Sequence, residues 1–289
     1  MAPKLEVRPV GPESFDDVYP LLLLFGNSNM SRDDWRQMLF TYTWWDGPVR
    51  GYAMYADGVP VGFMGTIFSN RRIMGRDEVF CNTSSWIVRE EHRNASIMLL
   101  KPVLALHECT IVNLTPSERG YAIFKKFGFK PLESEQLMMF PLASPSRIFG
   151  GSFTSDSNEL LRDLPNEERT IFQELSTSPR VRHVLLRRRG RNCYLVATPV
   201  RVKRLPFAEL QYIGDPKFFW ENRGLAHIAL LRTMGAVGVA VDGRFTTGRT
   251  VRWALRYSAK RLYRPAHPDT PPDAIDGLFS EFMTLKAAG

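Results

Sequence analysis

Residues 76–129 constrain the fold of this chain more than any other part of its sequence. An apolar strand pattern ends at Trp86–Val88, a charged turn covers Arg89–Arg93, and apolar residues at helical spacing run from Ile97 to Leu104. A helix that begins beside Arg93 presents unpaired backbone N–H groups and the positive end of its dipole. Such an end is suited to bind an anion such as a pyrophosphate. The segment therefore predicts a strand, an anion-binding turn and a helix in succession.

A second strand and helix follow in the same segment. The β-branched run "CTIVNL" at 109–114 predicts a short strand, and "ERGYAIFKKFGF" at 118–129 predicts a helix that ends at Gly128. Ahead of the segment, residues 5–10 predict a strand, Ser31 an N-cap, and Asp57–Gly58 the turn of a hairpin. We expect "EQLMMFPL" at 135–142 to complete this first sheet.

The second half of the chain repeats this order loosely. It reads as a helix, a hairpin around Gly190, a strand, a helix, a buried strand at 235–243 and a helix over "RTVRWALRYSAKRLYR" at 249–264. A chain of 289 residues is long enough for two domains. The Ser-, Gly- and Pro-rich stretch near residue 150 predicts a linker at 146–158. We therefore expect one domain at 1–145 and a second at 159–289.

Cysteine content and hydropathy give an expectation about where the protein works. There are three cysteines and no CxxC pair, so neither a disulfide scaffold nor a zinc site is predicted. The first ten residues lack the apolar stretch of a signal peptide, and "PLLLLFG" is too short to span a bilayer, which takes about 20 residues. We expect a cytoplasmic protein without a metal.

Positive charge is concentrated in the second half. The formal net charge is +8, and residues 180–264 hold 19 Lys and Arg against 4 Asp and Glu. This pattern favours an anionic partner, such as CoA phosphates, a nucleotide-sugar or an anionic membrane at the inner face of the cell envelope. A well-solvated basic surface is the other interpretation. No nucleic-acid reader motif occurs, so we do not expect nucleic acid as a partner.

On these motifs the chain resembles the GNAT superfamily of acyl-CoA-dependent N-acyltransferases over residues 5–142, and its second half resembles a degenerate copy. The resemblance implies an α/β fold with two tandem GNAT-like domains, each a mixed central sheet flanked by helices. The whole is similar to tandem-GNAT bacterial sugar N-acyltransferases and, more distantly, to Fem-type aminoacyltransferases of cell-wall synthesis.

The resemblance also implies an activity. An acyl group would pass from acetyl-CoA or a longer acyl-CoA, bound in the first half, to an amine held with the help of the second half. The acceptor would be an amino sugar of bacterial polysaccharide or glycan synthesis, carried on a nucleotide or a lipid. Two alternatives stay open: a non-catalytic binding or scaffold protein, and a Fem-type transferase that uses aminoacyl-tRNA.

Site residues follow from matching the family pattern to this sequence. The residues expected to bind the cosubstrate are Trp86, Ile87, Val88, Arg93, Asn94, Ala95, Ser96 and Asn113. Glu78 is the favoured general base, and Tyr121 the favoured general acid.

The sequence departs from the family pattern in two places. Ser96 and Met98 replace the small residues of the pyrophosphate turn, where glycine lets the backbone approach the phosphates. Phe124 stands where the family often has a tyrosine acid, which is why Tyr121, one turn away, is considered. Further candidate bases are Glu90, Glu91, His92 and His107, and Cys81 could attack a thioester, although buried cysteines are usually inert.

Overall fold

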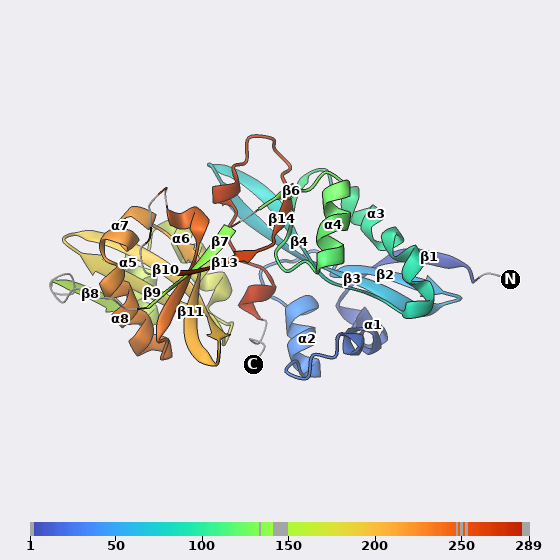
Figure 1. Cartoon of the computed structure of the whole chain (residues 1–289), viewed down its shortest axis with the longest axis horizontal. Helices are drawn as coiled ribbons and strands as arrows, with labels where there is room; N and C mark the ends of the chain where they lie inside the picture. The colour runs from blue at the N-terminus through green and yellow to red at the C-terminus, as the bar shows by residue number, and fades with distance from the viewer. Residues whose placement is uncertain are drawn as a thin grey trace. The chain divides into compact units, whose positions relative to one another are not determined.

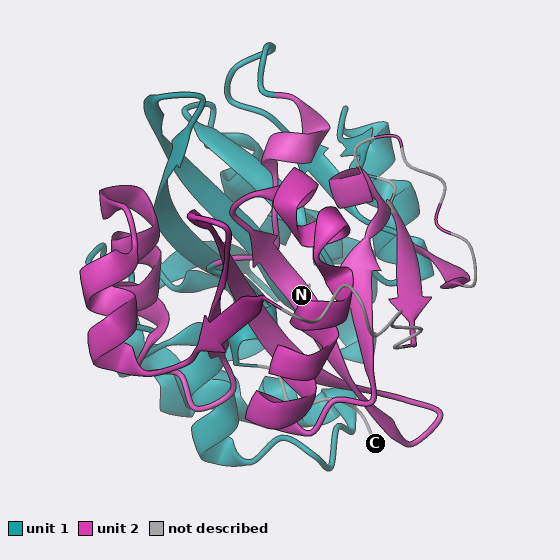
Figure 2. Cartoon of the chain, turned by 90° about the vertical axis from the view of Figure 1, so that its left-hand side faces the viewer, with its two compact units in different colours: residues 1–132, 260–270, 279–286 teal, residues 133–259, 271–278, 287–289 magenta. Residues whose placement is uncertain are grey.

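The computed structural model describes residues 3–132, 134–140, 150–246, 248, 251 and 254–284. It contains two seven-stranded sheets, each of which mixes antiparallel pairs with one parallel pair. The predicted α/β class with two mixed sheets flanked by helices is confirmed. The chain forms two compact units: residues 1–132, 260–270 and 279–286 make unit 1, and residues 133–259, 271–278 and 287–289 make unit 2 (Figure 2).

The sheet of unit 1 has the strand order β1-β2-β3-β4-β5-β14-β6. Its strands are β1 (Leu5–Val10), β2 (Gly51–Ala56), β3 (Val59–Ile73), β4 (Arg76–Val88), β5 (Cys109–Asn113), β14 (Leu262–Arg264) and β6 (Lys130–Pro131). The turn between β2 and β3 is Asp57–Gly58, as predicted, with positive φ at both residues.

Helices cover both faces of this sheet (Figure 1). On one face lie η1 (Pro12–Ser14), α1 (Phe15–Leu22), η2 (Leu23–Phe25) and α2 (Arg32–Leu39); on the other lie η3 (Glu90–Leu99), α3 (Leu100–Leu104) and α4 (Glu118–Lys126). The predicted N-cap Ser31 forms a capping box with Asp34, and Gly128 ends the α4 segment in the left-handed conformation.

Unit 2 has the order β8-β9-β10-β11-β12-β7-β13. Its strands are β8 (Gly151–Thr154), β9 (Arg182–Arg188), β10 (Arg191–Val202), β11 (Leu205–Ile213), β12 (Gly238–Asp242), β7 (Ser134–Met139) and β13 (Ala254–Ala259). Its helices are α5 (Ser157–Asp163), α6 (Asn166–Leu175), α7 (Pro216–Glu221), α8 (Arg223–Met234), η5 (Gly243–Thr246) and η6 (Pro272–Ala274).

The two sheets repeat one pairing pattern. In each, three antiparallel pairs are followed by one parallel pair, β4 with β5 and β11 with β12, and then by two more antiparallel pairs. The parallel run is four residue pairs long in both. This agreement, strand by strand, fits the tandem arrangement that the sequence predicts.

The repeat contains an exchange of one strand that the sequence did not predict. Sixth place in the first sheet is filled by β14 from the end of the chain, and sixth place in the second by β7, which directly follows β6 (Figure 1). The expectation that 135–142 completes the first sheet is therefore wrong. The expected domains at 1–145 and 159–289 did not include this exchange. Strand β8 begins inside the expected linker at 146–158. Residues 141–149 lie outside the described residues.

The helix expected at 249–264 is also wrong. Residues 254–259 form β13, which pairs along β7, and 262–264 form β14, which lies between β5 and β6. Arginines spaced three or four apart suggested a helical face, but the open edges of β7 and β5 offer backbone hydrogen bonds that only a strand can complete. In the described part of the chain, we find no helix with the length and apolar content needed to cross a membrane.

We predict that a fragment of residues 1–145 does not fold cooperatively. It lacks β14, the only described strand that pairs with β6, and loses the fully buried Leu262. A domain has only about 5–15 kcal/mol of stability to lose. Circular dichroism during heating measures this, with the full chain cleaved at a protease site inserted after residue 145 as control. The cleaved chain should keep a cooperative transition; a cooperative transition in the fragment alone would contradict the prediction.

Candidate functional site

The site lies where β4 and β5 separate. The parallel pairing joins Val79–Asn82 to Cys109–Val112, and β5 ends one residue later at Asn113. Strand β4 continues to Val88 and keeps only β3 on its other side. On that side, the backbone of 83–88 therefore has no pairing with β5.

A β-bulge shapes β4 at this opening. Ser84 pairs with Gly65 and Ile87 with Phe63, so Ser85 and Trp86 together face the single residue Met64. Ser85 has a φ of 56°, in the left-handed region that non-glycine residues rarely adopt. A bulge of this kind redirects side chains and backbone groups, and such bulges are frequent next to functional sites.

One cavity, of about 300 Å³, lies between the end of β4 and the helices that follow; we call it the helix-side cavity. Its lining includes Ile87 and Val88 of β4, Arg93 and Ser96 of η3, and Arg119 of α4. Two arginines in an otherwise uncharged lining make this cavity attractive to an anion.

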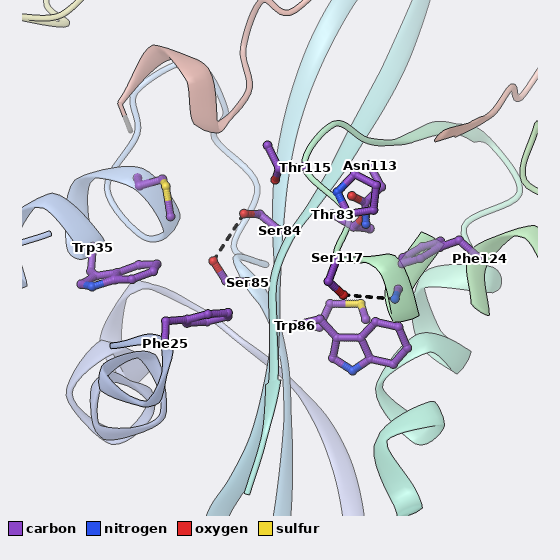
Figure 3. Close-up of a pocket in the computed structure, with 14 residues that line it drawn as sticks. Phe25, Trp35, Thr83, Ser84, Ser85, Trp86, Asn113, Thr115, Ser117 and Phe124 are labelled. Atoms are coloured by element: carbon purple, nitrogen blue, oxygen red, sulfur yellow. Dashed lines mark hydrogen bonds between the residues drawn. The ribbon is translucent and has the colours of Figure 1, made fainter. Parts of the chain in front are cut away.

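A second cavity, of about 210 Å³, lies at the bulge; we call it the aromatic cavity (Figure 3). Phe25 and Trp35 stack with 5.7 Å between ring centroids and form one side, and Trp86 and Phe124 lie on the other side of β4. Hydroxyl and amide groups line the rest: Thr83, Ser84, Ser85, Asn113, Thr115 and Ser117. None of its 14 lining residues is charged.

Three residues line both cavities and join them: Trp86, Ser117 and Gly120. Ser117 caps α4, where its Oγ accepts the Gly120 N–H at 3.1 Å, so its own proton remains to be donated. The indole Nε1 of Trp86 is buried and has no hydrogen-bond partner among the described residues. A buried donor of this kind is costly unless a ligand accepts from it.

The element after β4 is a 3₁₀ helix, η3, that only becomes an α-helix at Leu100. An α-helix through this region would need an N–H from Pro102 to bond the carbonyl of Met98, and proline has none. Met98, whose size departed from the family pattern, packs against the core of unit 1 and does not line either cavity. Ser96 does line the helix-side cavity.

Most of the residues predicted to bind the cosubstrate come together here. Trp86, Ile87, Val88, Arg93 and Ser96 line the helix-side cavity, and Asn113 lines the aromatic cavity. Asn94 is exposed and Ala95 packs against the core, and neither lines a cavity. The half-exposed Arg93 forms an ion pair with Glu90, one turn earlier in η3.

The two predicted catalytic residues lie elsewhere. Glu78 is buried near the start of β4, where it accepts hydrogen bonds from the hydroxyls of Thr110 and, at 3.5 Å, Thr270. Tyr121 places its ring 5.7 Å from the ammonium groups of Lys125 and Lys260. Neither residue lines the helix-side or the aromatic cavity.

The remaining candidates are also outside both cavities. Glu90, Glu91, His92 and His107 line neither one. Cys81 is fully buried, and burial raises the pKa of its thiol well above the usual value, so it is poorly suited to attack a thioester. Phe124, where the family often has tyrosine, is fully buried and packs edge-on against Trp86 and Phe129.

Sequence reasoning missed three parts of the aromatic cavity and its surroundings: the side formed by Phe25 and Trp35, which we call the aromatic wall, the hydroxyl groups, and one carboxylate. The polar run Asn82–Ser85 inside an otherwise apolar strand was a usable signal for the hydroxyls. Phe25 and Trp35 looked like ordinary core residues. Glu281, near the end of the chain, is fully buried and accepts hydrogen bonds from the Asn82 amide and, at 2.7 Å, from the Thr115 hydroxyl.

In unit 2, strand β11 likewise continues past its parallel pairing with β12, and two carboxylates lie near its end. Asp215 caps α7 by accepting the Phe218 N–H at 2.8 Å and pairs with Arg191. Burial alone would raise the pKa of Asp215, but these two partners outweigh it and lower the pKa. Beside β11, Glu168 accepts from the Tyr212 hydroxyl at 3.3 Å and lies against Gly214. The anion position of this repeat is thus occupied by a carboxylate.

Four arginines of the basic second half form ion pairs within unit 2. Arg187 pairs with Glu159 and Asp163, and Arg191 with Asp215 and Glu221. Arg244 pairs with Asp242, and Arg256 with Glu135. Three of these acids, Glu135, Glu159 and Asp163, precede the basic stretch in sequence, so the charge excess of 180–264 overstates the charge of the folded unit.

Comparison with solved structures shows that the chain has the fold of GCN5-related N-acetyltransferases. One from Anabaena variabilis superposes with a TM-score of 0.62 at 13% identity over 91% of this chain and 73% of that one. One from Kribbella flavida gives 0.60 at 11% identity over 91% and 71%. A glucosamine N-acetyltransferase region of a fungal multi-domain β-N-acetylglucosaminidase gives 0.60 at 13% identity over 91% of this chain and 38% of that one.

The likeness is one of fold and not of sequence. No family model matches the chain, and no curated protein matches it. Identities of 11–13% thus show a shared architecture alone.

We predict that Ser85→Val destabilises the protein by about 1–3 kcal/mol, because a β-branched residue tolerates the left-handed conformation poorly. Ser85→Gly should be neutral or stabilising. Ser84 is the matched control: it pairs regularly with Gly65, so valine should be tolerated there and glycine should cost about 0.5–1 kcal/mol. Urea unfolding measures all four variants. Equal effects of valine at the two positions would contradict the assigned bulge.

Proposed function

We propose that the protein transfers an acyl group from acyl-CoA to an amine. The observation that carries this proposal is the pair of joined cavities at the opening between β4 and β5: one has two arginines, and the other is uncharged and rich in hydroxyl and aromatic groups. Such a division suits a phosphate-bearing donor on one side and a small acceptor on the other.

The helix-side cavity would hold the CoA end. Arg93 and Arg119 would face the pyrophosphate. The pantetheine arm would run beside Trp86–Val88, whose backbone has no strand partner on that side, and the Trp86 indole N–H offers it a further donor. Ser96, which stands where the family has only a small residue, adds a hydroxyl to this cavity.

The aromatic cavity would hold the acceptor. Aromatic rings pack against the C–H face of a sugar, and Ser, Thr and Asn side chains bond its hydroxyls, so the lining suits an amino sugar. The fungal region of the same fold is named for glucosamine, which supports this choice. Since no lining side chain is charged, the phosphates of a nucleotide or lipid carrier would have to lie outside this cavity.

Transfer requires few groups. The amine, freed of its extra proton, attacks the thioester carbonyl at the junction, and N–H and hydroxyl donors at the bulge stabilise the oxyanion that forms. Ser117 faces the junction with a proton to donate and can supply it to the departing thiolate. In this mechanism Ser117 takes the role first expected of Tyr121.

Acyl-CoA binding is the first test. We expect acetyl-CoA to raise the melting temperature of the wild type, because a ligand that binds only the folded state stabilises it. Arg93→Ala should weaken this binding about tenfold, or about 1.4 kcal/mol. Arg72→Ala is the matched control, since Arg72 is equally half-exposed and also paired, with Asp77, but lines neither cavity. No shift with CoA, acetyl-CoA or longer acyl-CoAs would contradict the proposal.

Acceptor binding is tested through the aromatic wall. With glucosamine as acceptor and CoA thiol release as the assay, Trp35→Ala should raise the KM for glucosamine about tenfold or more and leave the KM for acetyl-CoA unchanged. Trp45→Ala is the control: Trp45 stacks on Phe68 much as Trp35 stacks on Phe25, but outside the cavity. If both variants change the acceptor KM alike, the aromatic cavity is not the acceptor site.

A further inference from the structure

A buried carboxylate lies directly behind the aromatic cavity. Glu281, in η7 (Glu281–Met283), has no solvent exposure, and one of its oxygens accepts the Thr115 hydroxyl at 2.7 Å. Thr115 is itself exposed and lines the cavity. The side-chain amide of Asn82, on β4, donates to the other oxygen. The Thr115 hydrogen bond thus connects a carboxylate that solvent cannot reach to a surface that a ligand can.

The direction of the Thr115 hydrogen bond determines which kind of ligand group Thr115 can bind in the cavity. A hydroxyl has one proton, and Thr115 donates it to Glu281. Toward the cavity its oxygen can therefore only accept. The Thr115 oxygen can therefore accept a hydrogen bond from a ligand donor such as an amine N–H.

We propose that Glu281 receives, through the hydroxyl of Thr115, the proton that the acceptor amine loses during acyl transfer. This inference rests on the proposed function. Thr115 is the group that touches the amine, and Glu281 acts through it as a proton store and positioning residue. Glu78, the base favoured from sequence, forms the same kind of pair with Thr110, but that pair lines neither cavity.

The protons balance in this scheme. The amine nitrogen forms a bond to the thioester carbon, and the carbon–sulfur bond breaks. One nitrogen-bound proton passes to Thr115 Oγ as the hydroxyl proton of Thr115 passes to Glu281. The thiolate takes a proton from the Ser117 hydroxyl, which regains one from solvent, and Glu281 returns its proton by the same path when the products leave.

The surroundings of Glu281 raise the pKa of its carboxyl above the usual value, which favours proton uptake. Burial raises the pKa of the carboxyl, while the bonds from Thr115 and Asn82 and the charge of Arg261 lower it by less. Arg261 is the charged neighbour; it is buried, and its guanidinium lies 5.2 Å from the ring of Phe282. A carboxylate whose pKa lies closer to the working pH takes up and releases a proton more readily.

Glu281 belongs to a segment that returns to unit 1 late in the sequence. Residues 279–286 belong to this unit, although 271–278 belong to unit 2. Phe279 packs against Trp44, with 5.9 Å between the ring centroids, and anchors this segment. The first unit thus obtains from the far end of the sequence the carboxylate that its own cavity lining lacks.

The test compares matched variants in acyl transfer from acetyl-CoA to glucosamine. Thr115→Val and Thr110→Val each delete one hydroxyl that donates to a buried glutamate, with almost no change of shape. Glu281→Gln removes the charge, and Thr115→Ser keeps the hydroxyl. The dependence of kcat on pH and the melting temperature are recorded for each variant.

We expect Thr115→Val and Glu281→Gln to lower kcat about 100-fold and to remove the fall in rate on the acidic side of the pH profile. Thr115→Ser should restore most of the rate, and Thr110→Val should change the melting temperature alone. If Thr115→Val keeps the wild-type kcat and pH profile, Glu281 is purely structural and the inference is wrong. That outcome differs from failure of the proposed function, in which the wild type itself shows no CoA release. If Glu281→Gln fails to fold, the comparison of Thr115→Val with Thr115→Ser is sufficient to test the proton transfer through Thr115.

Discussion

The short parallel pairing between β4 and β5 is the constraint on which the site depends. Only four residue pairs join these strands, so β4 runs on past the end of β5 with one edge open. The bulge at Ser85 then turns Trp86 to the point where both cavities meet. An open edge inside a sheet leaves backbone groups without partners, and burying them unsatisfied would be costly. A ligand with amide groups along its length resolves that cost, which is why the opening and the proposed pantetheine position coincide.

The two repeats show that this framework alone does not make a site. Unit 2 has the same strand order and the same four-pair parallel run, yet Asp215 occupies its helix start and Glu168 lies against Gly214. A carboxylate at a helix N-terminus satisfies the dipole and the free N–H groups that would otherwise attract a phosphate. In unit 1 the corresponding residue, Arg89, makes no such cap, although the first turn of η3 carries Glu90 and Glu91. The two repeats thus differ at this position by a few side chains on a similar backbone.

Local patterns in the sequence were enough to predict the elements that surround the helix-side cavity. The strand that ends at Val88, the basic turn and the helix after Ser117 each follow from short-range rules of periodicity and capping, and five of the eight predicted contacts line the expected cavity. What could not be predicted is non-local. Any exposed sheet edge can accept a strand with the composition of β7 or β14, so sequence alone does not say which sheet each one joins. Arginines at helical spacing led to the wrong prediction of a helix at 249–264. The open strand edges with which this segment pairs lie more than a hundred residues away in the sequence.

Glu78 was favoured as the base because it begins the strand that lines the cleft in the family, and Glu281 was not considered. Both are buried glutamates bonded to a threonine of the segment that follows β4. The two threonines differ in position: Thr110 lies within β5, where the strands are still paired, and Thr115 lies beyond its end, where they have separated. A proton acceptor is useful only where substrate can reach its relay, and in this fold that condition is met only after the strands part.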